Sequence, residues 1–234
     1  MKLIILSKNE YKEKDSIITG INDEELITFS VKGLSSPKSK NAILANPLII
    51  ADVNMKEGNY KYPICESSML LFSPYKLGDN LDKLAAISII SEATNKLLQD
   101  DEKSEMYDSL EKAIHALKDN KDPLQVVVTY LVQVLKLTGY EFELNECVFC
   151  GSKQNIVCFS FNEGGFICKD CYQKRDEYLF SGSQMLLLRK LFLNIEYQYI
   201  ENTNKEDVLI ILKEMSTFIL DNLGIALKSF SLLN

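Results

Sequence analysis

Residues 147–171 read CVFCGSKQNIVCFSFNEGGFICKDC and contain two C-x2-C pairs, Cys147/Cys150 and Cys168/Cys171. The 17 residues between the pairs give a spacing typical of structural zinc sites. Each pair forms a tight turn that directs two thiolates to one point, and Gly151 supplies the backbone freedom that the first turn needs. Four thiolates leave zinc no open position for water, so the pattern predicts one structural Zn²⁺ ion.

Other uses of these cysteines are two disulfides, thiols that only fill a core, or a redox pair. A cytoplasmic setting argues against disulfides, and redox C-x-x-C motifs come singly between a strand and a helix. Cys65 and Cys158 belong to neither pair. Cys158, between Val157 and Phe159, is expected to pack inward as a small apolar residue.

Length and composition describe an ordinary globular chain. It has 234 residues, of which 46% are hydrophobic and 25% charged. The net charge of -7 argues against a uniformly basic nucleic-acid binder, but residues 1–80 hold ten basic and ten acidic residues, so the excess of acid is C-terminal. No apolar run reaches the roughly 18 residues of a membrane span, and the N-terminus is too short in its apolar part for a secretory signal. We therefore expect a cytoplasmic protein with no membrane partner.

The N-terminal third alternates short β-rich runs with polar turns. The predicted strands are Lys2–Leu6, Ser16–Ile21, Leu26–Lys32, Leu48–Asn54 and Asn59–Glu66. Five short strands fit a small barrel. After Pro74 and Gly78 the apolar period changes from two to about 3.6, which marks a domain boundary.

The rest of the chain reads as helices around the cysteine segment. One helix starts at Leu81, the next carries Met106 to Leu117, and two follow the cysteines, capped by Ser183 and Asn204. The clearest starts at Asp122 and Pro123, has Gln125 placed for a capping box, and ends at Gly139.

The predicted fold is thus α+β, with a five-stranded barrel followed by a mainly α-helical domain into which a four-cysteine zinc module is inserted. The predicted ranges are residues 1–78 for the barrel, 79–145 and 177–234 for the helical domain, and 146–176 for the zinc module.

One loop concentrates positive charge. No acidic residue occurs between Leu26 and Ala51, and this stretch carries Lys32, Lys38 and Lys40. Such a loop on a small barrel can hold the phosphates of a nucleic acid, although lysines in loops often form plain solvated surface. The candidate stacking surfaces, which are also candidate core or rim residues, are Tyr11, Phe29, Tyr60 and Tyr62.

Positive signs of catalysis are absent from the sequence. His115 is the sole histidine and has no accompanying nucleophile motif. Phosphate-binding glycine loops, G-x-S-x-G and H-E-x-x-H do not occur. We expect a protein that is not an enzyme, and a groove between its later helices could seat a short acidic and hydrophobic peptide.

Several motifs in a fixed order resemble the bacterial recombination mediator family RecO. They are the loop from Val31 to Lys40, the stretches Leu70–Ser73 and Leu81–Ala85, Leu137-x-Gly139-Tyr140, and the cysteine pairs with Gly164-Gly165. The likeness spans nearly the whole chain. Each motif alone is unspecific, and the resemblance rests on their common order and spacing.

The resemblance implies an oligonucleotide-binding (OB) barrel at the N-terminus and a helical domain with an inserted zinc module. It also implies binding of single- and double-stranded DNA and annealing of complementary strands. The implied partners are RecR and the C-terminal tail of single-strand-binding protein, with which the protein would help to load RecA in the nucleoid. By the same resemblance Lys32, Lys38 and Lys40, with Lys8 as a weaker addition, contact DNA, and the four cysteines bind zinc.

One departure from the family pattern concerns the basic loop. Family loops often carry Arg where this chain has Leu34 and Ser35. We therefore expect DNA binding that is weaker and more sensitive to salt than in the family at large.

Two other functions fit the cysteine pattern. Arf GTPase-activating proteins use similar pairs but place an Arg after four intervening residues, whereas Arg175 follows Cys171 after three. A zinc-stabilised adaptor that binds only protein would leave the basic loop as plain surface.

Overall fold

A closed five-stranded barrel forms the N-terminal end of the computed structural model, which describes residues 1–36, 38–56, 58, 60–172, 179–194 and 196–233. The strands are β1 (Lys2–Tyr11), β2 (Asp15–Ile21), β3 (Leu26–Val31), β4 (Ile50–Lys56) and β5 (Ile64–Phe72). Their order around the barrel is β1-β2-β3-β5-β4, and β3 meets β5 in parallel through Ser30 and Ile64. The predicted barrel is confirmed.

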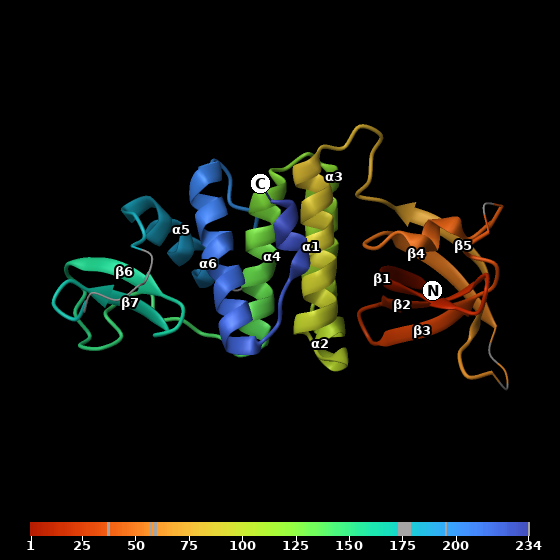
Figure 1. The fold of residues 1–234 in the computed structure, drawn as a ribbon, viewed down its shortest axis with the longest axis horizontal. Coiled ribbons are helices and arrows are strands. Elements are labelled where there is room, and N and C mark those ends of the chain that lie inside the picture. Colours follow the sequence, from red (N-terminus) through yellow and green to blue (C-terminus); the bar gives the residue numbers. More distant parts are fainter. Residues whose placement is uncertain (37, 57, 59, 173–178, 195, 234) are drawn as a thin grey trace.

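The first half of strand β1, residues 3–6, is buried on both faces. Leu3 and Ile5 point into the barrel core, which also contains Phe29, whereas Ile4 and Leu6 belong to the core of the helical region. The Oγ of Ser91 and the Nδ2 of Asn95 also donate hydrogen bonds to the carbonyl oxygen of Leu6, over 3.3 Å and 3.1 Å. One face of β1 therefore packs with the helices in one apolar cluster, whereas the barrel interior forms a separate cluster. Figure 1 shows the barrel beside the helices.

Six α-helices and the cysteine segment make up the rest of the described chain. The helices are α1 (Leu81–Leu97), α2 (Asp100–Glu105), α3 (Tyr107–Lys118), α4 (Pro123–Leu137), α5 (Gly182–Leu193) and α6 (Lys205–Leu223), and the 3₁₀ turns are η1 (Ala42–Ala45) and η2 (Lys228–Leu232). Helix α4 lies between α1 and α6 in Figure 1. Every side chain of α4 from Leu124 to Leu135 is buried, as expected of a central helix that is apolar over most of its surface.

The N-cap predicted for α4 is confirmed, but its predicted capping box is wrong. Asp122 does cap α4, because its Oδ1 accepts the N–H groups of Leu124 and Gln125, but Gln125 closes no capping box. The Nε2 of Gln125 donates to Thr129 instead, and the N–H of Asp122 is satisfied by the hydroxyl of Tyr199.

Helix α5 starts at Ser181 and not at Ser183. Its capping box pairs Ser181 with Gln184 over 2.8 Å and 3.3 Å. Ser181 and Ser183 are equally suitable N-cap residues by type. Only Ser181 is followed three residues later by a Gln, which a capping box requires.

Strand limits also differ from the prediction. The sequence predicted a strand from Leu48, but Leu48 has a φ of 59°, which is outside the β region. Strand β4 therefore starts at Ile50. The last predicted strand began at Asn59, which lies outside the described residues, whereas β5 runs from Ile64 to Phe72. The run Met69–Phe72 lacks apolar and polar alternation, but its pairing with β4 makes it a strand.

No helix in the described parts of the chain combines the length and apolar character needed to span a membrane.

Candidate metal centre and nucleic-acid interface

The cysteine module, residues 146–172 of the described chain, is a β-hairpin between two knuckles. Strands β6 (Ile156–Ser160) and β7 (Gly165–Cys168) pair antiparallel. In the first knuckle the N–H of Gly151 donates to the carbonyl of Cys147 over 2.8 Å, and Gly151 has a φ of 70°. In the second knuckle the N–H of Tyr172 donates to the carbonyl of Cys168 over 2.9 Å. Both turns aim their thiols at one point.

The four predicted ligands converge. The Sγ atoms of Cys147, Cys150, Cys168 and Cys171 all lie within 4.8 Å of one another. Cys65 lies in the barrel core, and Cys158 is fully buried against the module, as the sequence predicted for Cys158. The cluster can therefore hold a metal ion.

The electrostatics of the cluster favour a cation. Burial alone would raise the pKa of the Cys147 thiol, but hydrogen bonds from backbone N–H groups, first among them that of Cys168, lower it to about 6. Hydrogen bonding with Cys150, together with burial, raises the pKa of Cys171 to about 12. Because neighbouring thiolates repel each other, all four ionise together only around a positive ion. A set of soft thiolates fits Zn²⁺.

Backbone contacts attach the module to the helical region. The N–H of Glu143 donates to the carbonyl of Gly164 over 2.8 Å, and its carbonyl accepts from Phe166 over 2.9 Å. At Gly165 an added Cβ would stand 2.2 Å from the carbonyl oxygen of Glu143. The approach is so close that only glycine fits there.

A cluster of phenylalanines completes this attachment. The ring of Phe142 lies 5.6 Å from Phe159 and 5.3 Å from Phe161 in the module, and 4.9 Å from Phe192 and 5.9 Å from Phe218 on helices α5 and α6. The sequence placed Phe159 and Phe161 two residues apart, at the end of β6 and directly after it, and this spacing could have indicated the aromatic face.

The predicted DNA-contacting lysines are all exposed, but the structure does not gather them at one point. Lys32 follows β3 and lines a hollow in the barrel. Lys38 and Lys40 lie in the loop before η1, Lys8 lies on β1 opposite Ile18, and these three do not line the hollow. Pro37 of the basic loop lies outside the described residues.

Leu34 explains one departure from the family pattern. Its side chain is 4% exposed and belongs to the barrel core. The loop is held there by the N–H of Gly33, which donates to Asp15 over 2.9 Å. Position 34 therefore contributes apolar packing in this chain and no charge to a ligand.

The barrel hollow has a volume of about 390 Å³ and lies at the open ends of the strands. Its walls come from the β1–β2 turn, the facing ends of β2 and β3, and the residues before β5: Tyr11, Lys12, Asp15, Ser30, Lys32, Tyr60, Lys61, Tyr62 and Ile64. Ammonium groups lie over two of its rings, Lys12 over Tyr11 and Lys61 over Tyr62, both at 5.2 Å.

Three of the four suggested stacking residues therefore line one hollow. The fourth, Phe29, is fully buried in the barrel core and cannot stack on a ligand. Lys12 and Lys61 were not predicted, although each is next to a tyrosine in the sequence, a pairing that could have indicated them.

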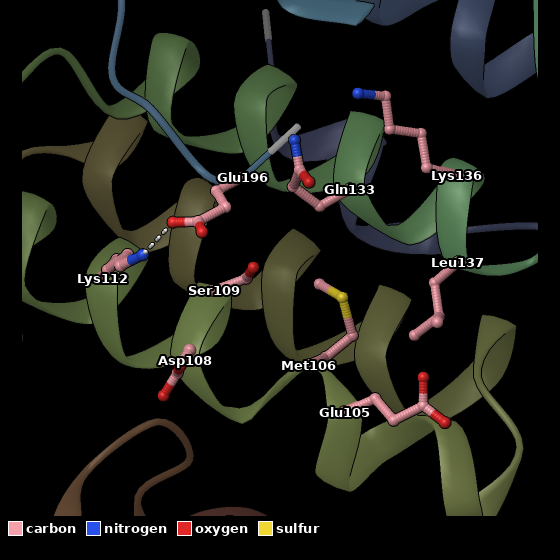
Figure 2. Close-up of a pocket in the computed structure, with 9 residues that line it drawn as sticks. All are labelled: Glu105, Met106, Asp108, Ser109, Lys112, Gln133, Lys136, Leu137 and Glu196. Carbon is pink, nitrogen blue, oxygen red and sulfur yellow. Dashed lines mark hydrogen bonds and ion pairs between the residues drawn. The ribbon is translucent and has the colours of Figure 1, made fainter. Parts of the chain in front are cut away.

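A second cavity, of about 440 Å³, lies in the helical region and is called here the helical groove (Figure 2). Its lining residues are Glu105, Met106, Asp108, Ser109, Lys112, Gln133, Lys136, Leu137 and Glu196. The Nε2 of Gln133 is buried and, among the described residues, has no hydrogen-bond partner. Lys136 donates to the carbonyl of Asn194, and burial lowers its pKa. The sequence predicted a groove between the later helices, whereas this groove lies mainly between α2, α3 and α4, and none of its residues was assigned to it.

The barrel, the helical region and the four-thiol cluster together define a class of proteins in which a small closed barrel is joined to a helical domain with a metal-binding module. The family model described as "Recombination protein O C terminal" matches residues 78–230. The chain belongs to the RecO family, as its motifs indicated.

Relatives match over most of the chain, including the barrel. DNA repair protein RecO of Thermoanaerobacter sp. (strain X514) is 28% identical over 236 residues, which cover 99% of this chain and 95% of the relative. The proteins of the same name from Bacillus subtilis (strain 168) and Clostridium perfringens (strain 13 / Type A) are 24% and 26% identical, over 91% and 75% of this chain and 84% and 73% of the relatives.

Proposed function

We propose that this protein acts in DNA repair by recombination as a DNA-binding mediator without catalytic turnover. In this role it binds single- and double-stranded DNA, anneals complementary strands, and helps to load RecA together with RecR and single-strand-binding protein. The family supports the repair role, and the observation that carries the DNA-binding role is the gathering of lysines and tyrosines at one end of the barrel.

The lysines of the basic loop are free to meet phosphates. In the described parts of the chain no carboxylate forms an ion pair with Lys32, Lys38 or Lys40. Each lysine that contacts a phosphate releases a condensed counterion, so such binding weakens as salt rises. The excess of acidic residues in the C-terminal part directs DNA toward the barrel.

We expect Lys38→Glu with Lys40→Glu to weaken single-strand binding at about 50 mM salt without lowering the unfolding temperature, because both side chains are exposed. Fluorescence anisotropy with a labelled oligonucleotide at about 50 and 200 mM salt also gives the salt dependence. Two lost phosphate contacts reduce the slope of log affinity against log salt by about 1.4.

The matched control is Lys190→Glu with Lys213→Glu, which reverses two exposed charges on α5 and α6. This control should change DNA binding far less. Equal affinity and slope for the loop variant and the wild type would contradict the role of the loop.

The helical groove supports one protein partner, the C-terminal tail of single-strand-binding protein. Such an acidic and hydrophobic tail needs donors for carboxylates and an apolar surface. Gln133 and Lys136 offer N–H groups on the α4 side, and Met106 and Leu137 offer apolar contact. In Figure 2 Glu105 and Asp108 lie on the opposite, α2–α3 side, so a bound tail would direct its carboxylates toward α4.

We expect Gln133→Leu with Lys136→Ala to weaken binding of a labelled peptide from the tail of the cognate single-strand-binding protein at least about fivefold, because two donors to carboxylates are lost. The same variant should bind DNA as the wild type does. Amidation of the peptide's C-terminus should weaken its binding to the wild type, and unchanged peptide affinity of the variant would exclude the groove.

These measurements also separate the alternatives. An adaptor that binds only protein predicts peptide binding with no DNA binding by the wild type. The spacing of Arg175, which lies outside the described residues, already differed from that of the GTPase regulators, and the family assignment gives this alternative no support.

A further inference from the structure

We infer that the free edge of strand β5 pairs with the same edge of a second copy of this chain, so that two barrels join in an antiparallel dimer. The surface involved, called here the β5 edge, consists of residues 66–72. This inference goes beyond the proposed function and does not depend on DNA binding. Under the proposed annealing role, the dimer would carry two barrel hollows, one for each complementary strand.

Strand β5 is bound to a neighbouring strand along only one edge over most of its length. On one side it pairs with β4 from Ile64 to Phe72. On the other side β3 meets it through Ser30 and Ile64, and beyond Ile64 no strand in the described ranges pairs with this side. In antiparallel pairing every second residue directs its N–H and C=O away from the partner strand. The β5 edge therefore presents backbone donors and acceptors that no other strand binds.

The side chains at this edge are apolar and exposed. Met69 is 59% exposed, Leu71 is 46% exposed and Leu70 is 44% exposed. Native edge strands usually carry lysines or prolines that prevent pairing with other chains, and residues 66–72 contain neither. The exposed apolar side chains continue after the strand, on the linker and the start of α1 (Figure 1), with Leu77, Leu81 and Leu84. Such an edge is suited to pairing with another strand.

The nearest loop contacts β5 from inside the barrel. The Oγ of Ser68 donates a hydrogen bond to the Oδ1 of Asn41 over 2.8 Å. Ser68 lies opposite Val53, which belongs to the barrel core. Cross-strand neighbours point to the same face of a sheet, so the contact with Asn41 lies on the inner face and not at the edge.

The regular part of the edge is short and can pair with itself. The register with β4 shifts at Glu66 and again at Leu71, which leaves residues 67–70 as a regular segment between two bulges. A two-fold axis between Ser68 and Met69 would place this segment antiparallel to its copy, and both edges would then be satisfied by the same contacts.

The same arrangement brings opposite charges together. Glu66 lies just before the regular segment, and the ammonium group of Lys118 lies just after it, 4.0 Å from the ring centroid of Phe72. Neither residue forms an ion pair with another described residue. In an antiparallel pair the start of one segment meets the end of the other, so Glu66 of each copy would lie near Lys118 of the other. A second copy therefore supplies both the strand and the complementary charges.

The mass of the intact chain in solution without DNA tests the pairing. We expect the mass measured by sedimentation to rise from that of a monomer toward that of a dimer between about 1 and about 100 µM, because so short an interface is weak. Met69→Lys with Leu71→Lys should remain a monomer over the same range, with an unchanged unfolding temperature because both side chains are exposed. A wild type that stays monomeric would overturn the inference and leave the proposed function in place.

A mixture of two charge variants tests whether the contact joins two copies. Glu66→Lys alone and Lys118→Glu alone should each weaken the dimer at least about fivefold, because each places like charges at two symmetric contacts. An equimolar mixture of the two should recover the wild-type dimer, since every contact in the mixed pair again joins opposite charges. Contacts within one chain cannot produce this recovery.

The control mixture combines Glu66→Lys with Lys190→Glu, which reverses an exposed charge on α5. This mixture should not recover the wild-type dimer. Wild-type affinity in both single variants, or no recovery when Glu66→Lys and Lys118→Glu are mixed, would show that another surface joins the copies and would overturn the role of the β5 edge.

Discussion

Cys168→Ser is expected to abolish the binding of one zinc ion per chain and to destabilise the helical end of the molecule. The remaining three thiols cannot complete a tetrahedron, and structural zinc sites contribute about 10–16 kcal/mol in small zinc peptides at pH 7. In this larger fold, where the Phe142 cluster also holds the module, we expect a loss of at least about 3 kcal/mol. Elemental analysis gives the metal content, and thermal unfolding with and without a chelator gives the stability.

The matched controls are Cys65→Ala and Cys158→Ala. Both residues are buried cysteines outside the cluster, so these variants should lose packing energy but keep one zinc per chain. A wild-type protein that is purified without metal and is as stable as the zinc-loaded form would refute a structural zinc site.

Gly165→Ala should destabilise the attachment of the cysteine module by about 3 kcal/mol or more. The new Cβ would stand 2.2 Å from the carbonyl oxygen and 2.8 Å from the nitrogen of Glu143, so the backbone must move and the bonds around Glu143 must break. Gly165 also has a φ of 152°, a conformation that residues with side chains rarely adopt. Thermal unfolding and proteolysis of the purified variant measure the effect.

The neighbouring glycine is the control for this prediction. Gly164 has a φ of 83°, but an added Cβ there would meet nothing within 4 Å. Gly164→Ala should therefore cost only about 1–2 kcal/mol, the ordinary penalty of a left-handed conformation. If the two alanine variants are equally stable, close approach to Glu143 does not constrain the attachment.

Features encoded by neighbours in the chain were predictable. The knuckles are a few residues long and Gly151 lies directly after the first, so their convergence could be read from spacing. The start of α4 at Asp122 and Pro123 and the end of α6 at Gly224 also follow from local backbone requirements.

Features assembled from distant segments were not predictable. Lys12 and Lys61 meet in one hollow only because the barrel closes, and the pairing partners of β5 cannot be read from its own sequence. The position of Gln133 at the helical groove was not predictable for another reason. Helix α4 is apolar over most of its length, so a polar residue within it looks like an exposed position, whereas the structure buries it at the helical groove.

The packing of β1 against the helices has a consequence for avidity. Ile4 and Leu6 on β1 pack in the same apolar cluster as α1 and α4, so the barrel that carries the hollow is packed directly on the helices that carry the groove. Under the proposed function, a strand coated with its binding protein is held at one of these sites, and the second contact then becomes intramolecular. The effective concentration of the second contact is then set by the reach of the partner's tail alone. Two individually weak contacts can therefore retain the protein on coated DNA but not on bare duplex.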